Sequence, residues 1–163
     1  MLRFEIRPAV PADVPQILRF IKALAEYEKL SHEVVATEAL LHEGLFGPRP
    51  TAEAMLAYQS DQPAGFVLFF HSFSTFTGRP SLYLEDLYVD EAFRGHGLGR
   101  LLLVHLAKIA QKRGCGRFEW SVLDWNKPTI AFYESLEAKP RPGWTVYQVT
   151  GEALARLAEE TLE

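Results

Sequence analysis

A glycine-rich turn flanked by arginines is the stretch of this chain whose residues are best suited to bind an anion. Residues 94–100 read Arg-Gly-His-Gly-Leu-Gly-Arg, between an alternating apolar run and a helical apolar pattern. The first four backbone N–H groups of a helix have no partner within it, and the positive end of its dipole lies there. Glycines let a phosphate approach such backbone closely. The stretch therefore predicts a diphosphate site.

The turn differs from the common nucleotide-binding loops. It lacks the Gly-Lys-Ser/Thr ending of a P-loop and does not match Gly-x-Gly-x-x-Gly, which disfavours a nucleoside triphosphate with magnesium. A tight turn without a ligand is the alternative interpretation. Arg100 argues for a ligand, because a cation in the first helical turn opposes the dipole unless an anion binds beside it.

Glu85 and Tyr133 have side chains suited to proton transfer. Glu85 lies in the apolar run 82–89, and Tyr133 follows Asn126 and Pro128 in a helical pattern. A carboxylate can accept a proton and a phenol can donate one. The alternatives are an exposed sheet carboxylate and a core tyrosine with a hydrated hydroxyl.

Composition restricts the class of protein. The chain has 163 residues, of which 48% are apolar and 23% charged, which predicts a single globular domain over residues 1–163. The net charge of -4 disfavours binding to nucleic-acid phosphates. The longest apolar run, about 66–70, is far shorter than a membrane span. With no secretion signal visible at the N-terminus, we expect a cytoplasmic protein.

Cysteine and histidine usage argues against metal and disulfide chemistry. Cys115 is the single cysteine, which excludes an intrachain disulfide and a thiolate metal cluster. The histidines have no metal-ligand spacing, so no metal site is predicted. Cys115 lies between two glycines and is interpreted as an inert small residue.

The elements that must position these residues follow from apolar periodicity. Short turns at 60–63 and 77–80 indicate antiparallel neighbours, and the later alternation of helix and strand indicates crossovers. The prediction is a mixed α/β fold with a central mixed twisted sheet flanked by helices. Strands are expected over 2–7, 52–59, 65–73, 81–89, 117–123 and 144–149, and helices over 13–27, 37–44, 97–113, 126–136 and 152–161.

Some details of these helices are also predicted. Asp13 is the expected N-cap of the first helix, with Pro15 near its first position. Gly44 is expected to stop the second helix. The third should bury one apolar stripe, formed by Leu98, Leu101, Leu102, Leu106, Ile109 and Ala110.

Arg94-x-x-Gly97-x-Gly99 resembles the acetyl-CoA signature of the GCN5-related N-acetyltransferases (GNAT), which share the acyl-CoA N-acyltransferase fold. The chain is also similar to the diamine (spermidine/spermine) N-acetyltransferase subgroup over nearly its whole length. The matching stretches are 6–9, 12–13, 17–19, 24–25, 27–28, 82–86, 94–95, 125–133 and 143–144.

The resemblance implies that the protein binds acetyl-CoA. The pantetheine arm would pair with the backbone of Leu87, Tyr88 and Val89, as an added strand does. The diphosphate would lie on Arg94, Gly95, His96, Gly97, Leu98, Gly99 and Arg100, and Asn126 and Tyr133 would also contact the cofactor.

The implied reaction is transfer of an acetyl group to a primary amine. An alkyl ammonium has a pKa of about 10.4 and must lose a proton before it attacks. Glu85 would be the general base through water, and Tyr133 the general acid toward the leaving thiolate. A backbone N–H near Leu87 or Tyr88 would hold the developing oxyanion.

Carboxylates near the proposed reaction centre favour a cationic substrate. Positions that match substrate contacts in the subgroup, or that add carboxylate or ring surface, are Tyr27, Glu28, Glu85, Asp86, Glu119, Trp120, Ser121 and Trp144. A solvated acidic face is the alternative interpretation.

Two departures from the subgroup concern the C-terminal part of the chain. Glu137 stands where the family usually has glycine, and Lys-Pro-Arg-Pro at 139–142 replaces an acidic, serine-rich loop. The added cations make long polyamines less suitable and favour a smaller amine or an amino acid with its own carboxylate.

The predicted function is thus acetyl-CoA-dependent N-acetylation of a small polyamine, diamine or amino-acid-like substrate. A non-catalytic acyl-CoA-binding module and a protein amine acetyltransferase are the alternatives. A homodimer is implied by the subgroup, and neither nucleic acid nor membrane is expected as a partner.

Overall fold

The computed structural model describes residues 2–160, which cluster into two compact units, Met1–Leu123 and Asp124–Glu163. We call them the N-terminal and C-terminal units and describe each by itself. No helix among the described residues is long and apolar enough to cross a bilayer. The expectation of one domain over 1–163 stays a prediction.

The N-terminal unit contains one sheet with the order β1-β2-β3-β4-β5. The strands are β1 (Glu5–Pro8), β2 (Glu53–Gln59), β3 (Gln62–Ser74), β4 (Arg79–Val89) and β5 (Arg117–Trp120). The first four pair antiparallel, and β5 pairs parallel to β4. The predicted antiparallel beginning and later crossover are therefore confirmed.

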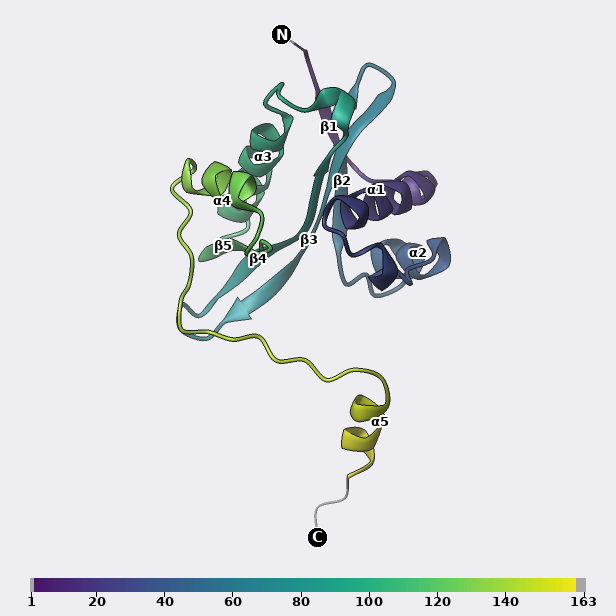
Figure 1. The fold of residues 1–163 in the computed structure, drawn as a ribbon, viewed down its shortest axis with the longest axis vertical. Helices are drawn as coiled ribbons and strands as arrows, with labels where there is room; N and C mark the ends of the chain where they lie inside the picture. Colours follow the sequence, from purple (N-terminus) through teal and green to yellow (C-terminus); the bar gives the residue numbers. More distant parts are fainter. Residues whose placement is uncertain (1, 161–163) are drawn as a thin grey trace. The chain divides into compact units, whose positions relative to one another are not determined.

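The helices of this unit cover both faces of the sheet, with α1 and α2 on one face and α3 on the other (Figure 1). They are α1 (Val14–Tyr27), α2 (Glu38–Phe46) and α3 (Leu98–Lys112), joined by the short 3-10 helices η1 (Pro11–Asp13), η2 (Ser31–Glu33) and η3 (Glu91–Phe93). The helix α3 is the crossover between the parallel strands β4 and β5, as such a connection requires.

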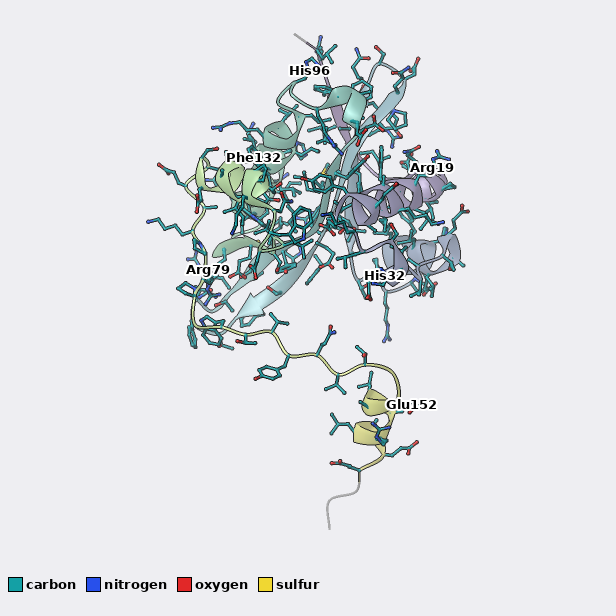
Figure 2. All side chains as sticks on the ribbon, viewed as in Figure 1. Arg19, His32, Arg79, His96, Phe132 and Glu152 are labelled. Atoms are coloured by element: carbon teal, nitrogen blue, oxygen red, sulfur yellow. The ribbon has the colours of Figure 1, made fainter. Side chains whose placement is uncertain are left out.

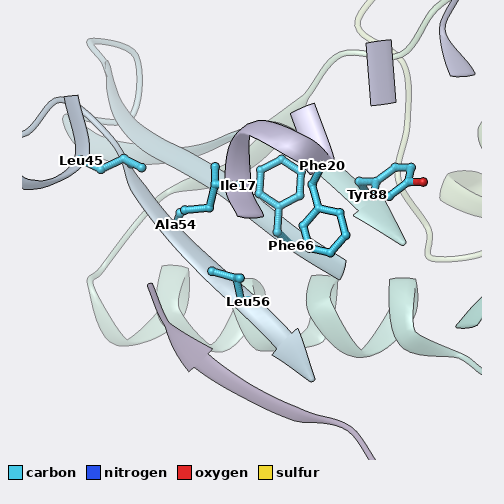
Figure 3. Close-up of a cluster of buried hydrophobic side chains, with 7 residues drawn as sticks. All are labelled: Ile17, Phe20, Leu45, Ala54, Leu56, Phe66 and Tyr88. Atoms are coloured by element: carbon cyan, nitrogen blue, oxygen red, sulfur yellow. The ribbon is translucent and has the colours of Figure 1, made fainter. Parts of the chain in front are cut away.

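The core between α1 and the sheet forms because the helical and strand periods each place apolar side chains on the face that meets the other element. Ile17 and Phe20 recur at helical spacing on α1, while Leu56 and Phe66 project from neighbouring strands. All four side chains are buried, and the rings of Phe20 and Phe66 stack with centroids 5.7 Å apart (Figure 3). Each such burial contributes about 1.5–3 kcal/mol, which fixes α1 against the sheet.

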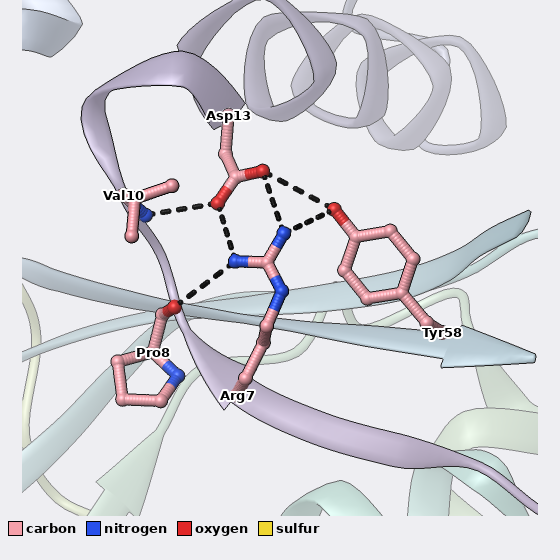
Figure 4. A network of polar contacts seen from close by, with 5 residues as sticks. All are labelled: Arg7, Pro8, Val10, Asp13 and Tyr58. Carbon is pink, nitrogen blue, oxygen red and sulfur yellow. Dashed lines mark hydrogen bonds and ion pairs between the residues drawn. The ribbon is translucent and has the colours of Figure 1, made fainter. Parts of the chain in front are cut away.

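A polar network ties β1 to the start of α1 (Figure 4). Arg7 donates to both carboxylate oxygens of Asp13, at 2.8 and 3.0 Å, and to the hydroxyl of Tyr58 at 2.8 Å. Burial alone would raise the pKa of Asp13, but the hydrogen bonds from Arg7 and the Val10 N–H, with the Arg7 charge, hold that pKa below its ordinary value. The acid is therefore ionised in the fold.

One sequence prediction about these elements is confirmed in position but lacks the expected hydrogen bond, and three are wrong in detail. Asp13 is the N-cap of α1 but makes no side-chain cap hydrogen bond, because its carboxylate binds Arg7 and the Val10 N–H instead. The helix α2 passes Gly44 and ends before Gly47. Leu101 is exposed on α3 and Leu103 is buried in its place. The strand expected over 117–123 ends at Trp120.

The C-terminal unit contains α4 (Lys127–Glu134) and α5 (Gly151–Glu159). The strand predicted over 144–149 is absent, and these residues form neither helix nor strand. Val146 and Tyr147 are 92% and 91% exposed. A strand needs a paired edge for its backbone groups, and no described strand pairs with this segment. The helix expected over 152–161 is observed as α5, and its expected last residue lies outside the described residues.

Candidate functional site

The outer edge of β4 is open along its second half. In the parallel pair, Ser81–Leu84 of β4 face Arg117–Trp120 of β5. No described strand pairs with that edge of β4 beyond Leu84. Leu87, Tyr88 and Val89, the predicted pantetheine positions, lie in this open stretch, still paired to β3 on the other side. An unpaired strand edge offers the donors and acceptors that an extended ligand can use.

A β-bulge marks the point where the edge opens. Leu68 of β3 faces Asp86 and Phe69 faces Leu84, so Glu85 is an extra residue on β4. Bulges bend a strand and redirect side chains, and they are common next to active sites. Here the bulge leaves Glu85 exposed while Leu84 stays buried.

The second half of β4 leads through η3 into the glycine turn, which His96 marks in Figure 2. Gly95 and Gly97 have positive φ angles of 78° and 80°, and no atom would lie within 4 Å of a Cβ on either. Gly97 is the N-cap of α3 and supplies no side-chain hydrogen bond to the helix. The first intrahelical bond there runs from the Leu101 N–H to the Gly97 carbonyl.

These features fit the diphosphate of a coenzyme. The N–H groups of Leu98, Gly99 and Arg100 precede the first intrahelical donor, so no helical carbonyl accepts from them. The open space beside the two glycines leaves this backbone accessible. His96 and Arg100 are exposed, whereas the Leu98 side chain is in the core, so Leu98 can offer a ligand only its backbone.

Sequence reasoning missed one glycine that shapes the same region. Gly65 of β3 lies opposite Val89, and a Cβ at this position would come within 2.5 Å of the Tyr88 carbonyl oxygen. A side chain there would push β3 away from the open half of β4. The signal was available, since glycine inside a strand pattern indicates close approach of another backbone.

Three carboxylates lie near the bulge, from two elements. Glu85 and Asp86 come from β4, and Glu28 is the C-cap of α1. Burial first, and then the negative charges of Glu85 and Glu28, raise the pKa of Asp86 to about 6. Burial also raises the pKa of Glu28. Such a cluster favours a cation, which would relieve the mutual repulsion.

The end of α1 positions Tyr27 and Glu28 by local backbone geometry. Lys29 has a positive φ of 62°, its N–H donates to the Glu26 carbonyl, and the Leu30 N–H donates to the Ala25 carbonyl at 2.7 Å. This is the Schellman pattern of helix termination. It ends the helix directly after the two predicted substrate-contact residues.

The predicted contacts on β5 and directly after it already have partners. Glu119 lies 3.8 Å from the Arg117 guanidinium, and the Ser121 hydroxyl is 2.7 Å from that of Tyr83. Trp120 packs edge-on against Phe118, with ring centroids 4.9 Å apart. The pairing of β5 with β4 places Glu119 opposite Tyr83, at the paired half of β4 rather than the open half.

Within the C-terminal unit, the predicted residues lie on α4 and in the following coil. Asn126 is buried, and its side chain caps α4 by accepting from the Thr129 N–H. Tyr133 lies seven positions later on α4 and is half-buried, beside the ring of Phe132. Trp144 is 69% exposed, and the Arg141 guanidinium lies over its ring at 5.6 Å.

The open strand edge and uncapped helix fit an extended coenzyme with a diphosphate, and the carboxylate cluster fits a cationic substrate. The profile described as the acetyltransferase (GNAT) family matches residues 20–137. The chain belongs to this family. Its members take the acetyl group from acetyl-CoA, so the family predicted from the glycine turn is confirmed.

Relatives of this acetyltransferase cover almost its entire length. Thialysine N-epsilon-acetyltransferase of Mus musculus is 37% identical, over 97% of this chain and 99% of the relative. L-ornithine N5-acetyltransferase of Arabidopsis thaliana is 34% identical, over 91% and 85%. Spermidine/spermine N(1)-acetyltransferase-like protein 1 of Homo sapiens is 34% identical, over 96% of this chain and 24% of the relative.

The fold of this acetyltransferase is shared with solved structures. An integron cassette protein from the mobile metagenome of V. cholerae matches with a TM-score of 0.80 and 25% identity, covering 98% of this chain and 100% of that one. The predicted mixed α/β acyltransferase fold and the predicted N-acetyltransferase class are therefore confirmed. The roles of the individual site residues stay predictions.

Proposed function

We propose that this protein transfers the acetyl group of acetyl-CoA to a primary amine of a small substrate, with amino-acid-like amines preferred over long polyamines. The observation that carries the proposal is one continuous stretch, β4 to α3, which combines two of the three clustered carboxylates, an open strand edge and an uncapped helix N-terminus. The named activities of the full-length relatives support the substrate class.

The cofactor would be held mainly by backbone. Leu87, Tyr88 and Val89 would pair with the pantetheine arm, and residues 94–100 would bind the diphosphate through N–H groups, with Arg94 and Arg100 adding positive charge. The resemblance adds a contact from Asn126. When bound, acetyl-CoA supplies an activated acetyl group as a thioester.

The chain's own residues would handle the protons. Glu85, exposed at the bulge, would accept a proton from the substrate ammonium through water, which frees the nitrogen lone pair. The Tyr133 hydroxyl would donate the proton that a leaving sulfur needs. Glu28 and Asp86 would attract and orient the cationic substrate, with Tyr27, Glu119, Trp120, Ser121 and Trp144 as the other proposed contacts.

The preference for amino-acid-like amines rests on charge. Residues 139–142 carry Lys139 and Arg141, which would repel the distal ammonium of a long polyamine and attract a carboxylate. Two relatives are named for amino acids, thialysine and L-ornithine.

The test is release of thiol from acetyl-CoA with matched pairs of amines. L-ornithine is compared with putrescine, and L-lysine with cadaverine, because each pair differs only in the carboxylate. Thialysine, spermidine and an aminoglycoside complete the panel. We expect the amino acid of each pair to give the higher kcat/KM. Equal or reversed ratios would contradict the preference, and no release with tight cofactor binding would favour a non-catalytic binding module.

The variant Tyr133→Phe tests the general acid. Loss of one positioned proton donor is expected to lower kcat about 10²–10⁴-fold, because the leaving sulfur then departs without a proton. The dissociation constant of acetyl-CoA should be nearly unchanged, as measured by calorimetry. Unchanged turnover would exclude Tyr133 from that role.

We also propose that the enzyme is cytoplasmic and, as the resemblance implies, that it acts as a homodimer. The helix α5 supports the second, because Leu154 and Leu157 lie three positions apart on it and are 53% and 54% exposed. An apolar pair at this spacing suits contact with another helix.

A further inference from the structure

Arg94 opens the glycine turn, and its side chain contacts three other elements. Its Nη1 lies 3.5 Å from the Glu91 Oε1 of η3, and its other contacts are with β4 and α1. Its Nε donates to the Val89 carbonyl oxygen at 3.0 Å. The guanidinium carbon lies 5.4 Å from the ring centroid of Tyr27 and 5.7 Å from that of Tyr88. Tyr27 is the last residue of α1, and Tyr88 belongs to β4. One side chain therefore connects the turn with the end of α1 and the end of β4.

A guanidinium is suited to this position because it can lie over aromatic rings and donate hydrogen bonds in its plane at the same time. The two rings differ in mobility. Tyr88 is buried and packs against Phe20 at 5.5 Å, so it forms a fixed wall. Tyr27 is 42% exposed at a helix end, so its ring is less restrained by core packing than the ring of Tyr88, and Arg94 lies against it.

The end of α1 also carries the acidic part of the candidate amine site. Glu28 follows Tyr27 directly, and its charge acts on Asp86. A change in the contact between Arg94 and Tyr27 would therefore change the position of Glu28, where the substrate ammonium is expected to bind. Arg94 itself begins the turn that is expected to bind the diphosphate.

We propose that Arg94 is a positioning residue that couples cofactor binding at the glycine turn to the order of the α1 end through the ring of Tyr27. The inference rests on the proposed function, since it assumes a diphosphate at residues 94–100. Ordering the turn fixes Arg94, which fixes Tyr27 and with it Glu28. Because coupling free energies are reciprocal, a well-ordered α1 end must strengthen cofactor binding by the same factor.

Hydrogen exchange with coenzyme A as the probe tests this coupling without knowledge of the amine. In the unmodified protein, saturating coenzyme A should slow exchange in residues 94–101 and also in residues 25–31, the latter by about two- to five-fold, as expected for a partly exposed cation–π contact. In Arg94→Gln at saturating coenzyme A, protection of 94–101 should remain and protection of 25–31 should be lost.

Variants of Tyr27 separate the ring from the hydroxyl. Tyr27→Leu should raise the dissociation constant of coenzyme A about two- to five-fold, whereas Tyr27→Phe, which keeps the ring, should leave that constant unchanged. The double variant Arg94→Gln/Tyr27→Leu should be no weaker than Arg94→Gln, since the contact is already lost. Arg19→Gln, an exposed arginine on α1 that pairs with Gln16 (Figure 2), is the matched control and should behave as the unmodified protein.

The outcomes distinguish this inference from the proposed function. Absence of protection at 94–101 in the unmodified protein would overturn the diphosphate site itself. Protection at 94–101 without protection at 25–31, or protection at 25–31 that persists in Arg94→Gln, would overturn the coupling and leave the proposed function standing. Additive effects in the double variant would overturn it as well.

Discussion

At the scale of single residues, two kinds of constraint meet in the candidate site. Gly95 and Gly97 are needed for a backbone conformation with positive φ and for open space beside it. Asp86 is there for its charge, and its surroundings make that charge depend on pH near neutrality. The first constraint concerns the cofactor and the second the amine, so the two can be tested separately.

Replacing Gly97 by valine should weaken cofactor binding. A β-branched residue at a φ of 80° is strained, by about 1–2 kcal/mol, and its side chain would fill the space next to the uncapped N–H groups. We expect the dissociation constant of coenzyme A, measured by calorimetry, to rise at least ten-fold. Gly78→Ala, also at positive φ but in the β3–β4 hairpin, controls for backbone strain and should leave coenzyme A binding unchanged.

Asp86 should make amine recognition pH-dependent. Its pKa of about 6 arises first from burial and then from Glu85 and Glu28, so it ionises as the pH rises from 5 to 7.5. An alkyl ammonium, with a pKa of about 10.4, stays charged over this range. The KM for the amine should therefore fall several-fold as the pH rises, and Asp86→Asn should flatten that profile. A profile that is unchanged by the substitution would remove Asp86 from the amine site.

The raised pKa of Asp86 also makes the free energy of unfolding depend on pH. Because the folded state raises the pKa of Asp86, it binds the proton more tightly than the unfolded chain does. The resulting stabilisation is complete below the unfolded pKa, near 4, and is lost as the pH rises through about 6. Between pH 4 and pH 7 the free energy of unfolding of Asp86→Asn should decline less than that of the unmodified protein, by on the order of 1–2 kcal/mol.

At the scale of elements, helix ends decide where the functional side chains lie. The helix α1 is followed by Lys29 with a φ of 62°, and α4 is followed by Glu137 with a φ of 65°. At α4 the Ala138 N–H returns to the Tyr133 carbonyl at 3.2 Å. The left-handed conformation is unfavourable for a residue with a Cβ, which agrees with the glycine that the resemblance implies at this position.

Glu137→Gly should therefore stabilise the end of α4. Removing the side chain relieves the left-handed strain at a position where the backbone already adopts the conformation that glycine prefers. We expect an increase of about 1 kcal/mol in the free energy of unfolding, partly offset by the entropy of the more flexible unfolded chain, measured by urea denaturation. Glu134→Gly, at the last residue of the same helix, should instead destabilise by up to about 1 kcal/mol.

At the scale of the whole molecule, the segment after α4 carries apolar side chains that the described chain leaves exposed. Trp144, Val146 and Tyr147 lie in coil, and Leu154 and Leu157 on α5. The proposed homodimer would give such side chains a place to bury apolar surface.

The double substitution Leu154→Glu/Leu157→Glu should therefore shift the protein from dimer to monomer. Two carboxylates at this spacing would oppose burial of the α5 face. Light scattering after gel filtration reports the mass, and Ala155→Glu on the same helix serves as a charge control that should stay dimeric. A monomeric mass for the unmodified protein would contradict the proposed assembly.

Many elements of this fold could be predicted from the sequence because they depend on interactions between near neighbours in the chain. The helix ending at Tyr27, the antiparallel strands around the turns 60–63 and 77–80, and the helix after the glycine turn all depend on near neighbours in the chain, and all three are observed. Periodicity and turn residues act over a few positions. The family could be identified from the sequence for the same reason, because Arg94-x-x-Gly97-x-Gly99 is a contiguous motif.

Only the tertiary structure decided features that depend on contacts distant in sequence. The carboxylate of Asp13 accepts hydrogen bonds from Arg7 and the Val10 N–H and makes no cap hydrogen bond to α1. The segment 144–149 has the alternation of a strand, but no described strand edge pairs with it. The resemblance implied a bulge that opens the strand edge, but its position at Glu85 and the place of Arg94 between Tyr27 and Tyr88 depend on contacts distant in sequence. Strand pairing and side-chain contacts of this kind are settled by what the rest of the fold brings alongside, which no local pattern contains.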